Sequence, residues 1–206
     1  MLRYALSQNF PDIASWELAA EGPTRVQNPT SNQLGTEIHV NLSHSRGWIM
    51  CVLCSTGACG CDIEALPRRG DTQRIASRYF TAKEVDALKY MEQDVRNDAF
   101  LTMWTLKEAY LKARKTGIAG GLGSLEVVPG AEGWQARSDL AGLDSDLSPA
   151  LYRYAGAETR AAAVFFRPEA LATRPESFEV ICKNRMFQPR VMHKPELINH
   201  QLLWEK

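Results

Sequence analysis

The longest helical pattern of the chain runs from residue 97 to residue 116 and reads NDAFLTMWTLKEAYLKARKT. It contains neither glycine nor proline, and Gly117 follows it directly. Because internal Gly and Pro destabilise helices and Gly commonly ends them, this stretch predicts one long helix. At about 100° per residue, four large apolar side chains form one arc of this helix: Phe100, Leu101, Trp104 and Leu111. One face of the helix is therefore expected to pack on a core.

Two charged residues of this helix lie on or beside the apolar arc. Glu108 falls inside it, between Trp104 and Leu101, and Lys112 lies at its edge one turn later. A carboxylate directed toward the core needs a partner, which can be a metal ion, a cationic side chain or a hydrogen-bond donor. The alternative is an ordinary Glu108–Lys112 pair at i,i+4 spacing on a solvated face.

Two strands are predicted ahead of the helix, over residues 38–43 and 48–53, and the turn at residues 44–47 joins them into a hairpin. Ser43 and His44 lie where the first strand ends, and a hydroxyl and an imidazole in that place can bind phosphate oxygens. A polar turn without a ligand is the alternative. Hydrolase chemistry is disfavoured, because the sequence lacks the Gly-x-Ser-x-Gly elbow.

Two acidic residues follow the hairpin in the short predicted strand GCDIE at residues 60–64. Side chains at i and i+2 of a strand point the same way, so Asp62 and Glu64 are expected on one face. Adjacent carboxylates repel each other unless a cation lies between them, and hard oxygen ligands suit Mg²⁺. The alternative is an ordinary exposed strand face.

The remaining patterns predict further helices and short strands. Residues 71–80 favour a helix, and Thr81 with Glu84 three residues later is the capping-box pattern that opens another. Short strands are predicted at residues 125–128, 134–137 and 161–166. Beyond Arg167 the prolines predict an extended arm rather than a core element. Mixed elements in this order indicate the α+β class.

The composition disfavours two classes of partner. Among 206 residues, 24 are Lys or Arg and 24 are Asp or Glu, so no net field recruits nucleic acid or a membrane surface. No apolar run reaches the roughly 18 residues of a membrane helix. The first residues lack the basic-then-apolar pattern of a signal peptide, so a cytoplasmic protein is expected.

Five cysteines are present, and four of them crowd into residues 51–61. Crowding of this kind is compatible with a zinc site. The surrounding residues 48–54 read instead as a buried strand, in which cysteine acts as a small hydrophobe. No histidine lies at zinc-finger spacing, so the second interpretation is favoured.

Three segments follow one another along the chain: NLSHS at residues 41–45, GCDIE at 60–64 and WTLKEAYLK at 104–112. Together with residues 78–84 (RYFTAKE), they resemble the ordered signatures of the 4′-phosphopantetheinyl transferases. The type they resemble is the pseudodimeric one that activates peptide synthetases such as surfactin synthetase. The resemblance covers residues 38 to about 128 and implies an α+β fold with two pseudo-symmetric lobes.

Two departures from the family pattern concern the first lobe. Only about forty residues precede the Ser-His motif, so either this lobe is reduced or the chain is shortened. The expected division is a shortened N-terminal lobe at residues 1–59, with the Ser-His motif, and a C-terminal lobe at residues 60–206, with the magnesium and helix motifs. The family's Gly-Lys-Pro stretch is replaced near residues 22–25, where Arg25 substitutes for the lysine.

The resemblance implies a holo-[acyl-carrier-protein] synthase, a magnesium-dependent enzyme that moves the 4′-phosphopantetheine of coenzyme A to a carrier-protein serine and releases 3′,5′-ADP. The magnesium ligands that it implies are Asp62, Glu64 and Glu108. Glu108 also takes the serine proton, because a serine hydroxyl is a weak nucleophile without a base. The residues implied in binding the phosphates of coenzyme A are Ser43, His44, Lys107, Lys112 and Arg25. Lys112 stabilises the charge on the departing 3′,5′-ADP, and a solvated side chain is the alternative for Lys107.

The partners implied by the resemblance are coenzyme A and an acyl or peptidyl carrier protein. A reduced first lobe would leave a sheet edge uncovered, so a monomer or a weak homodimer is expected. Two other functions stay open from the residues. One is a non-catalytic relative that binds coenzyme A or a carrier protein, and the other is an unrelated Mg²⁺-dependent phosphohydrolase.

Overall fold

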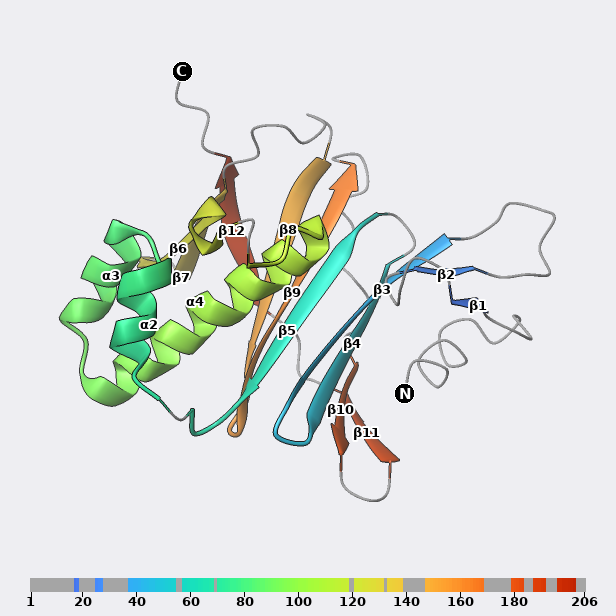
Figure 1. Cartoon of the computed structure of the whole chain (residues 1–206), viewed down its shortest axis with the longest axis horizontal. Coiled ribbons are helices and arrows are strands. Elements are labelled where there is room, and N and C mark those ends of the chain that lie inside the picture. Colours follow the sequence, from blue (N-terminus) through green and yellow to red (C-terminus); the bar gives the residue numbers. More distant parts are fainter. Residues whose placement is uncertain are drawn as a thin grey trace.

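In the computed structural model, two six-stranded sheets lie next to each other, and helices cover one face of the second sheet (Figure 1). This arrangement confirms the α+β class. The residues that the structure describes are 17–18, 25–27, 37–54, 57–68, 70–118, 121–131, 133–138, 147–168, 179–183, 187–191 and 196–202. The helical tail that the sequence suggests at residues 1–8 lies outside them. Among the described helices, none is both long and apolar enough to cross a membrane.

The first sheet has the strand order β1-β2-β3-β4-β10-β11, and each neighbouring pair is antiparallel. Its strands are β1 (Glu17–Leu18), β2 (Arg25–Gln27), β3 (Glu37–Ser45), β4 (Trp48–Cys54), β10 (Glu179–Lys183) and β11 (Phe187–Val191). The hairpin predicted over residues 38–53 is confirmed as β3 and β4. Its turn is tighter than predicted, because Arg46 and Gly47 form it with φ angles of 42° and 91° while His44 and Ser45 still pair within β3.

The second sheet has the order β5-β9-β8-β12-β7-β6 and contains one parallel pair, between β12 and β7. Its strands are β5 (Cys59–Ala65), β6 (Leu125–Gly130), β7 (Gly133–Ser138), β8 (Leu147–Ala155), β9 (Thr159–Pro168) and β12 (Glu196–Leu202). The predicted strands at residues 60–64, 125–128, 134–137 and 161–166 all lie within these bounds. The central pair of β8 and β9 runs antiparallel over nine residue pairs, so this sheet forms the larger continuous surface for packing.

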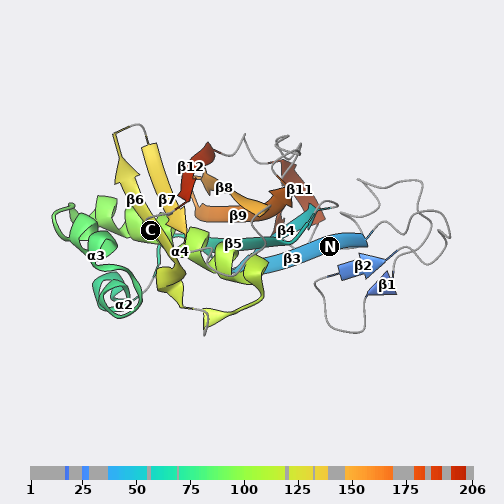
Figure 2. The same ribbon diagram turned by 90° about the horizontal axis from the view of Figure 1, so that it is seen from above.

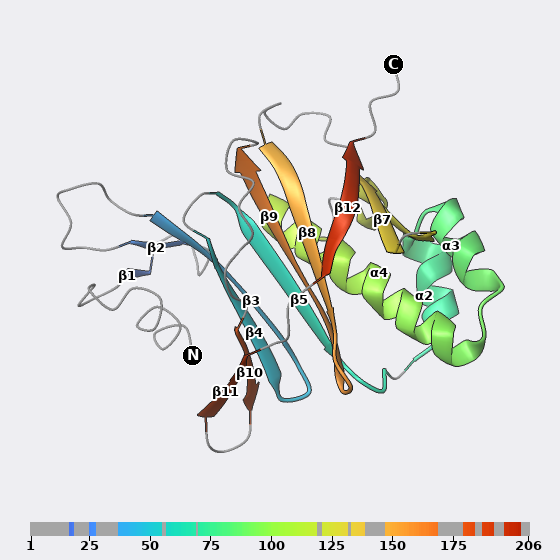
Figure 3. The same cartoon turned by 180° about the vertical axis from the view of Figure 1, so that it is seen from behind.

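The prediction of an extended arm beyond Arg167 is wrong. The chain there returns to both sheets: β10 pairs with β4 in the first, and β12 lies between β8 and β7 in the second (Figure 3). β10 and β12 pair with strands far away in the chain, and only the pair of β10 and β11 is local, so no pattern within this segment indicates that it joins the two sheets. The division at residues 59 and 60 stays a prediction, and β10 and β11 add C-terminal strands to the sheet of the first segment.

Three helices follow β5, namely α2 (Thr72–Tyr79), α3 (Ala82–Lys89) and α4 (Gln93–Arg114). The capping box is confirmed, because the Thr81 hydroxyl accepts from the Glu84 amide and the Glu84 carboxylate accepts from the Thr81 amide. Helix α4 starts four residues earlier than predicted, since its polar first turn carries no apolar periodicity. It ends at Arg114 and is capped by Lys115, whose φ of 58° is left-handed.

Helix α4 packs across β5 and β9, where one glycine sets the distance. A Cβ atom at Gly60 would lie 2.1 Å from the Ala109 carbonyl oxygen and 2.4 Å from the Ala113 amide nitrogen. Only a residue without a side chain permits this approach of backbone to backbone. The apolar arc predicted on the helix is confirmed, since Phe100, Leu101 and Leu111 are buried.

The structure contradicts both sequence interpretations of Lys107, as a phosphate ligand and as a solvated side chain. The Lys107 side chain is 0% exposed and pairs with the equally buried Glu84 at 2.8 Å. Its ammonium also donates to the carbonyl oxygens of Leu122, at 2.7 Å, and Leu125. Burial lowers the pKa of Lys107, and the Glu84 carboxylate opposes that shift. Lys107 therefore anchors α4 to the loop before β6.

We expect Glu84→Ala to lower the free energy of unfolding by about 3–5 kcal/mol, because it leaves the Lys107 ammonium buried without its counter-ion. The Val127 amide also donates to Glu84, at 2.7 Å, so a second buried group loses its partner. Urea denaturation followed by circular dichroism measures the change. The control is Lys83→Ala on the same helix, whose exposed ion pair with Glu126 should contribute little. An equal effect of both substitutions would contradict this account.

Candidate functional site

The candidate site lies at the seam between the two sheets, where β3 and β5 run alongside each other (Figure 2). The two strands belong to different sheets, and side chains of β3 take the place of a backbone ladder. They accept hydrogen bonds from β5 amides: Asn41 Oδ1 from Cys61 at 2.9 Å, Ser43 Oγ from Ile63 at 3.3 Å, and Ser45 Oγ from Ala65 at 3.1 Å. Alternate residues of β3 thereby give hydrogen-bond acceptors to the amides along this edge of β5.

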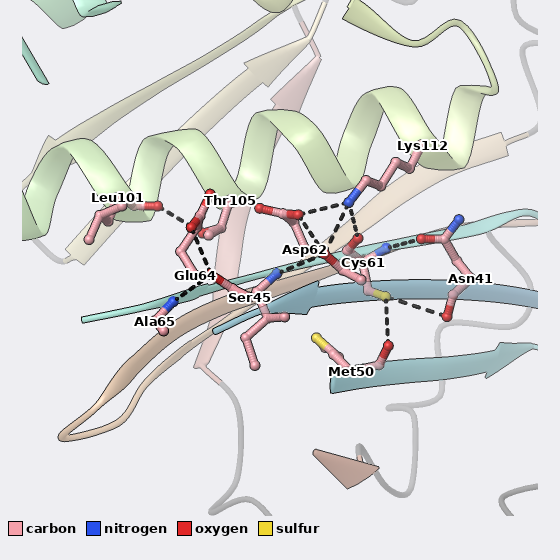
Figure 4. A network of polar contacts seen from close by, with 12 residues as sticks. Asn41, Ser45, Met50, Cys61, Asp62, Glu64, Ala65, Leu101, Thr105 and Lys112 are labelled. Carbon is pink, nitrogen blue, oxygen red and sulfur yellow. Dashed lines mark hydrogen bonds and ion pairs between the residues drawn. The ribbon is translucent and has the colours of Figure 1, made fainter. Parts of the chain in front are cut away.

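The two serines also hold the two carboxylates of β5. Ser43 donates to Asp62 Oδ1 at 2.8 Å. Ser45 donates to Glu64 Oε2 at 3.1 Å (Figure 4). Both carboxylates extend from β5 toward α4, as the i,i+2 spacing predicts. Each serine hydroxyl thus accepts from one β5 amide and donates to the neighbouring carboxylate, which fixes the register of the seam and the carboxylates together.

Lys112 reaches from α4 into the same place. Its ammonium lies 2.7 Å from Asp62 Oδ1, 3.1 Å from the Cys61 carbonyl oxygen and 3.2 Å from Ser43 Oγ. These three acceptors match the three donors of a lysine ammonium. Lys112 therefore joins helix α4 to the seam, and its ion pair is with Asp62 rather than the solvated pair with Glu108 that formed the alternative.

The second oxygen of Asp62 is an open position. Oδ2 is buried and has no hydrogen-bond partner within the described residues. Burial raises the pKa of Asp62, and the Lys112 ammonium and the hydrogen bonds from Lys112 and Ser43 oppose the shift. A buried carboxylate oxygen without a partner is costly, and a cation is one group that would satisfy it.

Glu64 is held on both oxygens, and one of its partners, Arg68, is not predicted by any pattern in the sequence. Arg68 Nη1 lies 3.2 Å from Glu64 Oε1. The Arg68 guanidinium lies over the rings of Phe100 and Trp104, 5.2 Å and 4.9 Å from their centroids. The i,i+4 spacing of Glu64 and Arg68 was no signal, because Pro67 lies between them and the segment is not helical. Trp104 therefore supports Arg68 in addition to packing on the core.

Glu108 stands in the same electrostatic environment. Its side chain is half-buried, and burial raises its pKa; the charge of Asp62 and, more weakly, that of Glu64 add to the rise, while Lys112 and Arg68 oppose it. Within the described part of the chain, no three His, Cys, Asp or Glu side chains stand arranged to hold a metal ion. The structure thus brings Glu108 into the field of the two β5 carboxylates without a closed cage of ligands.

The other predicted residues lie at varying distance from this group. His44 is exposed, and because side chains alternate along a strand it points away from the face of Ser43. Arg25 lies in β2, and its side chain is outside the described residues. The structure therefore brings together Ser43, Asp62, Glu64, Glu108 and Lys112 and leaves His44 and Lys107 apart from them.

The cysteines behave as small hydrophobes, as the strand interpretation predicts. Cys51, Cys54, Cys59 and Cys61 are buried and form no disulfide bond. Burial raises the pKa of Cys59 and Cys61, as expected of thiols that pack among apolar residues. The Cys61 thiol donates to the Asn41 carbonyl oxygen at 3.4 Å, which adds a contact to the seam.

Comparisons with known proteins agree with the resemblance noted in the sequence. A family model described as the 4′-phosphopantetheinyl transferase superfamily matches residues 58–164. The 4′-phosphopantetheinyl transferase HetI of Nostoc sp. is 38% identical over 79 residues, which cover 38% of this chain and 33% of that protein. The 4′-phosphopantetheinyl transferase Sfp of Bacillus subtilis is 32% identical over 91 residues, covering 44% and 39%. The matched stretch thus spans a third to two fifths of these relatives.

One solved structure is also similar. It is a holo-(acyl-carrier-protein) synthase of Bacillus anthracis in complex with CoA (3′,5′-ADP). The similarity covers 54% of this chain and 96% of that chain, at 19% sequence identity and a TM-score of 0.43.

In metal-free protein at neutral pH, we expect Glu108→Gln to raise the free energy of unfolding, because the half-buried carboxylate lies among other acidic groups. Its folded pKa is raised above the unfolded value, so the folded state binds the proton more tightly. The cost to stability is therefore absent below the unfolded pKa and complete above the folded pKa. The advantage of Glu108→Gln should shrink as the pH falls through this window.

Urea unfolding in the presence of a chelator, between about pH 4 and 8, measures this dependence. The matched control is Asp86→Asn on the exposed face of α3, which should show little change across the range. A stability difference for Glu108→Gln that does not vary with pH would contradict the assignment of the carboxylate to this cluster.

Proposed function

Because the chain belongs to the 4′-phosphopantetheinyl transferase superfamily, we propose that it transfers the 4′-phosphopantetheine group of coenzyme A to a serine of an acyl or peptidyl carrier protein. The second product is 3′,5′-ADP. The observation that carries the proposal is the network of Ser43, Asp62 and Lys112, in which three segments of the family pattern meet at one seam. An unrelated phosphohydrolase has no comparable support.

A divalent cation, Mg²⁺, is part of the proposal. Asp62 would hold it through the open Oδ2, which fits a cation as its missing partner, and Glu64 and Glu108 would turn toward the same point, since the three carboxylates do not stand arranged around an ion in the described structure. Carboxylate oxygens are the ligands that Mg²⁺ prefers. When bound, the ion would neutralise charge on the pyrophosphate and orient the phosphorus under attack.

The protein's own residues have separate roles. Glu108 accepts the proton of the carrier serine, because a serine hydroxyl is a weak nucleophile without a base. Lys112 stabilises the negative charge of the departing 3′,5′-ADP as a point charge, while keeping contact with Asp62. Ser43 contributes to the binding of the phosphates, and Arg25 is proposed for the same role, whereas the exposed His44 points away from the site. Lys107 has no part in the reaction, since it is fully buried in its pair with Glu84.

The pseudodimeric, surfactin-synthetase-activating type is the finer form of this proposal. Its support is the split of the β-structure into two sheets at the junction of β3 and β5, which falls close to the proposed lobe boundary after residue 59. The proposed first lobe carries Ser43 and His44, and the second carries the three carboxylates and Lys112. The site then depends on the contact between lobes, because Ser43 from one binds Asp62 from the other.

The test is incubation of the full chain with coenzyme A, Mg²⁺ and an apo carrier protein, followed by mass spectrometry of the carrier. We expect the mass to rise by one phosphopantetheine group. Asp62→Asn should reduce turnover by about 10²–10³-fold, because it removes one preorganised charge from the site. The control Lys83→Met, an exposed residue of α3, should leave turnover unchanged. Binding of coenzyme A without any mass change would favour a non-catalytic relative.

Arg68 is proposed as a positioning residue, because its ion pair orients the Glu64 carboxylate. Arg68→Lys keeps the charge but loses the planar guanidinium that lies over Phe100 and Trp104 while it pairs with Glu64. We expect Mg²⁺ to bind about 10–100-fold more weakly, as happens when a residue that orients a ligand is lost. Calorimetry with Mg²⁺, without coenzyme A, measures this apart from turnover. The matched control is Arg78→Lys on the exposed face of α2, and equal effects would contradict the role of Arg68.

A further inference from the structure

We propose that a cavity between α2, α3 and α4 binds a small carboxylate with an apolar body, such as a medium-chain fatty acid. The cavity has a volume of about 410 Å³, within the range of small-molecule sites. No described residue that lines it belongs to the group of Asp62, Glu64, Glu108 and Lys112. The inference does not depend on the proposed transfer reaction.

One wall of the cavity is apolar. It is formed by Ala76 from α2, Val85 and Leu88 from α3, and Phe100 from α4. Leu88 and Phe100 are 4% and 0% exposed, so they belong to the main core and offer a rigid surface. Val85 is the partly exposed residue of this wall, so an alkyl chain in the cavity would mainly cover its side chain, and binding is favoured in proportion to that apolar area.

The cavity also has a positively charged hydrogen-bond donor, Arg96, in the first turns of α4. Its Nη1 donates to the Met91 carbonyl oxygen at 3.5 Å, a long hydrogen bond. Its Nε is buried and has no hydrogen-bond partner among the described residues. A guanidinium presents its donors in a planar fork that matches a carboxylate, so Arg96, which lines the cavity and has an Nε without a partner among the described residues, favours a carboxylate over a neutral group.

The charges around the cavity agree with an anionic ligand. Arg74 and Lys89 line it together with Arg96, and Asp71 is the acidic residue among the lining side chains. The Asp71 carboxylate accepts a hydrogen bond from the Arg74 amide, where it caps α2, so its charge is engaged by the start of that helix. Three basic side chains against one capping carboxylate leave the rim positive.

The shape favours a small molecule over a protein segment. The lining residues come from three helices that converge on one pocket, and Phe100 closes it on the side of the core. The other contacts of Phe100 are with Phe80 and Trp104, at centroid distances of 5.1 Å and 5.9 Å. A ligand against Phe100 therefore touches the aromatic group that also supports Arg68.

The experiment is calorimetric titration of the full chain with octanoate, below its micelle concentration, and with 1-octanol as the neutral ligand of equal chain length. We expect octanoate to bind at least about tenfold more tightly than 1-octanol, because only the carboxylate pairs with Arg96. Chemical-shift changes in α2, α3 and the start of α4 should locate it. Absence of saturable octanoate binding, or equal binding of the two ligands, would overturn the proposal.

Two variants separate the site from general surface charge. Arg96→Gln should weaken octanoate binding at least about tenfold and leave 1-octanol unchanged. Arg78→Gln, on the exposed face of α2 and outside the cavity, should change neither. Should Arg96→Gln fail to fold, Val85→Trp fills the cavity instead and should abolish binding of both ligands. Tight binding of an acidic peptide, with no binding of octanoate, would also overturn the proposal.

Discussion

The seam between β3 and β5 is the contact on which the arrangement of the candidate site depends. The amides on this edge of β5 need acceptors, because a buried N–H without a partner is costly. Asn41, Ser43 and Ser45 supply them from alternate positions of β3. The same two serines then donate to Asp62 and Glu64, so the bonds that join the sheets also orient the carboxylates.

Helix α4 completes the site because it can lie very close to β5. Gly60 removes the side chain that would meet the helix backbone at Ala109 and Ala113. This approach places Lys112 within 2.7 Å of Asp62, and Glu108 in the field of the same carboxylate. On the other hand, the buried pair of Lys107 and Glu84 fixes the helix to α3 and to the loop before β6. Adjacent residues 107 and 108 thus serve stability and the site respectively.

The parts of this design that follow local periodicity were predictable from the sequence. The helix around Glu108, the hairpin that contains Ser43 and the shared face of Asp62 and Glu64 each rest on spacings within neighbouring residues. The position of Lys107 was not predictable from the sequence. Its partner Glu84 lies on another helix, and the period of one helix does not indicate ion pairs between helices. The same holds for Arg68, whose aromatic support comes from α4. The C-terminal strands could not be predicted for a related reason, since the partners of β10 and β12 in the two sheets are distant in the chain.

The charges of the site explain why it would gain from a ligand. Three carboxylates, those of Asp62, Glu64 and Glu108, face two cations, Lys112 and Arg68. Burial raises the pKa of Asp62 and Glu108, so the folded chain opposes the charge that it gathers there. Sites that work on charged substrates commonly retain such unfavourable groups at the expense of stability. Oδ2 of Asp62 is the buried carboxylate oxygen of this group that has no hydrogen-bond partner among the described residues. A cation bound there would offset the excess negative charge, and Lys112 could keep its ion pair with Oδ1.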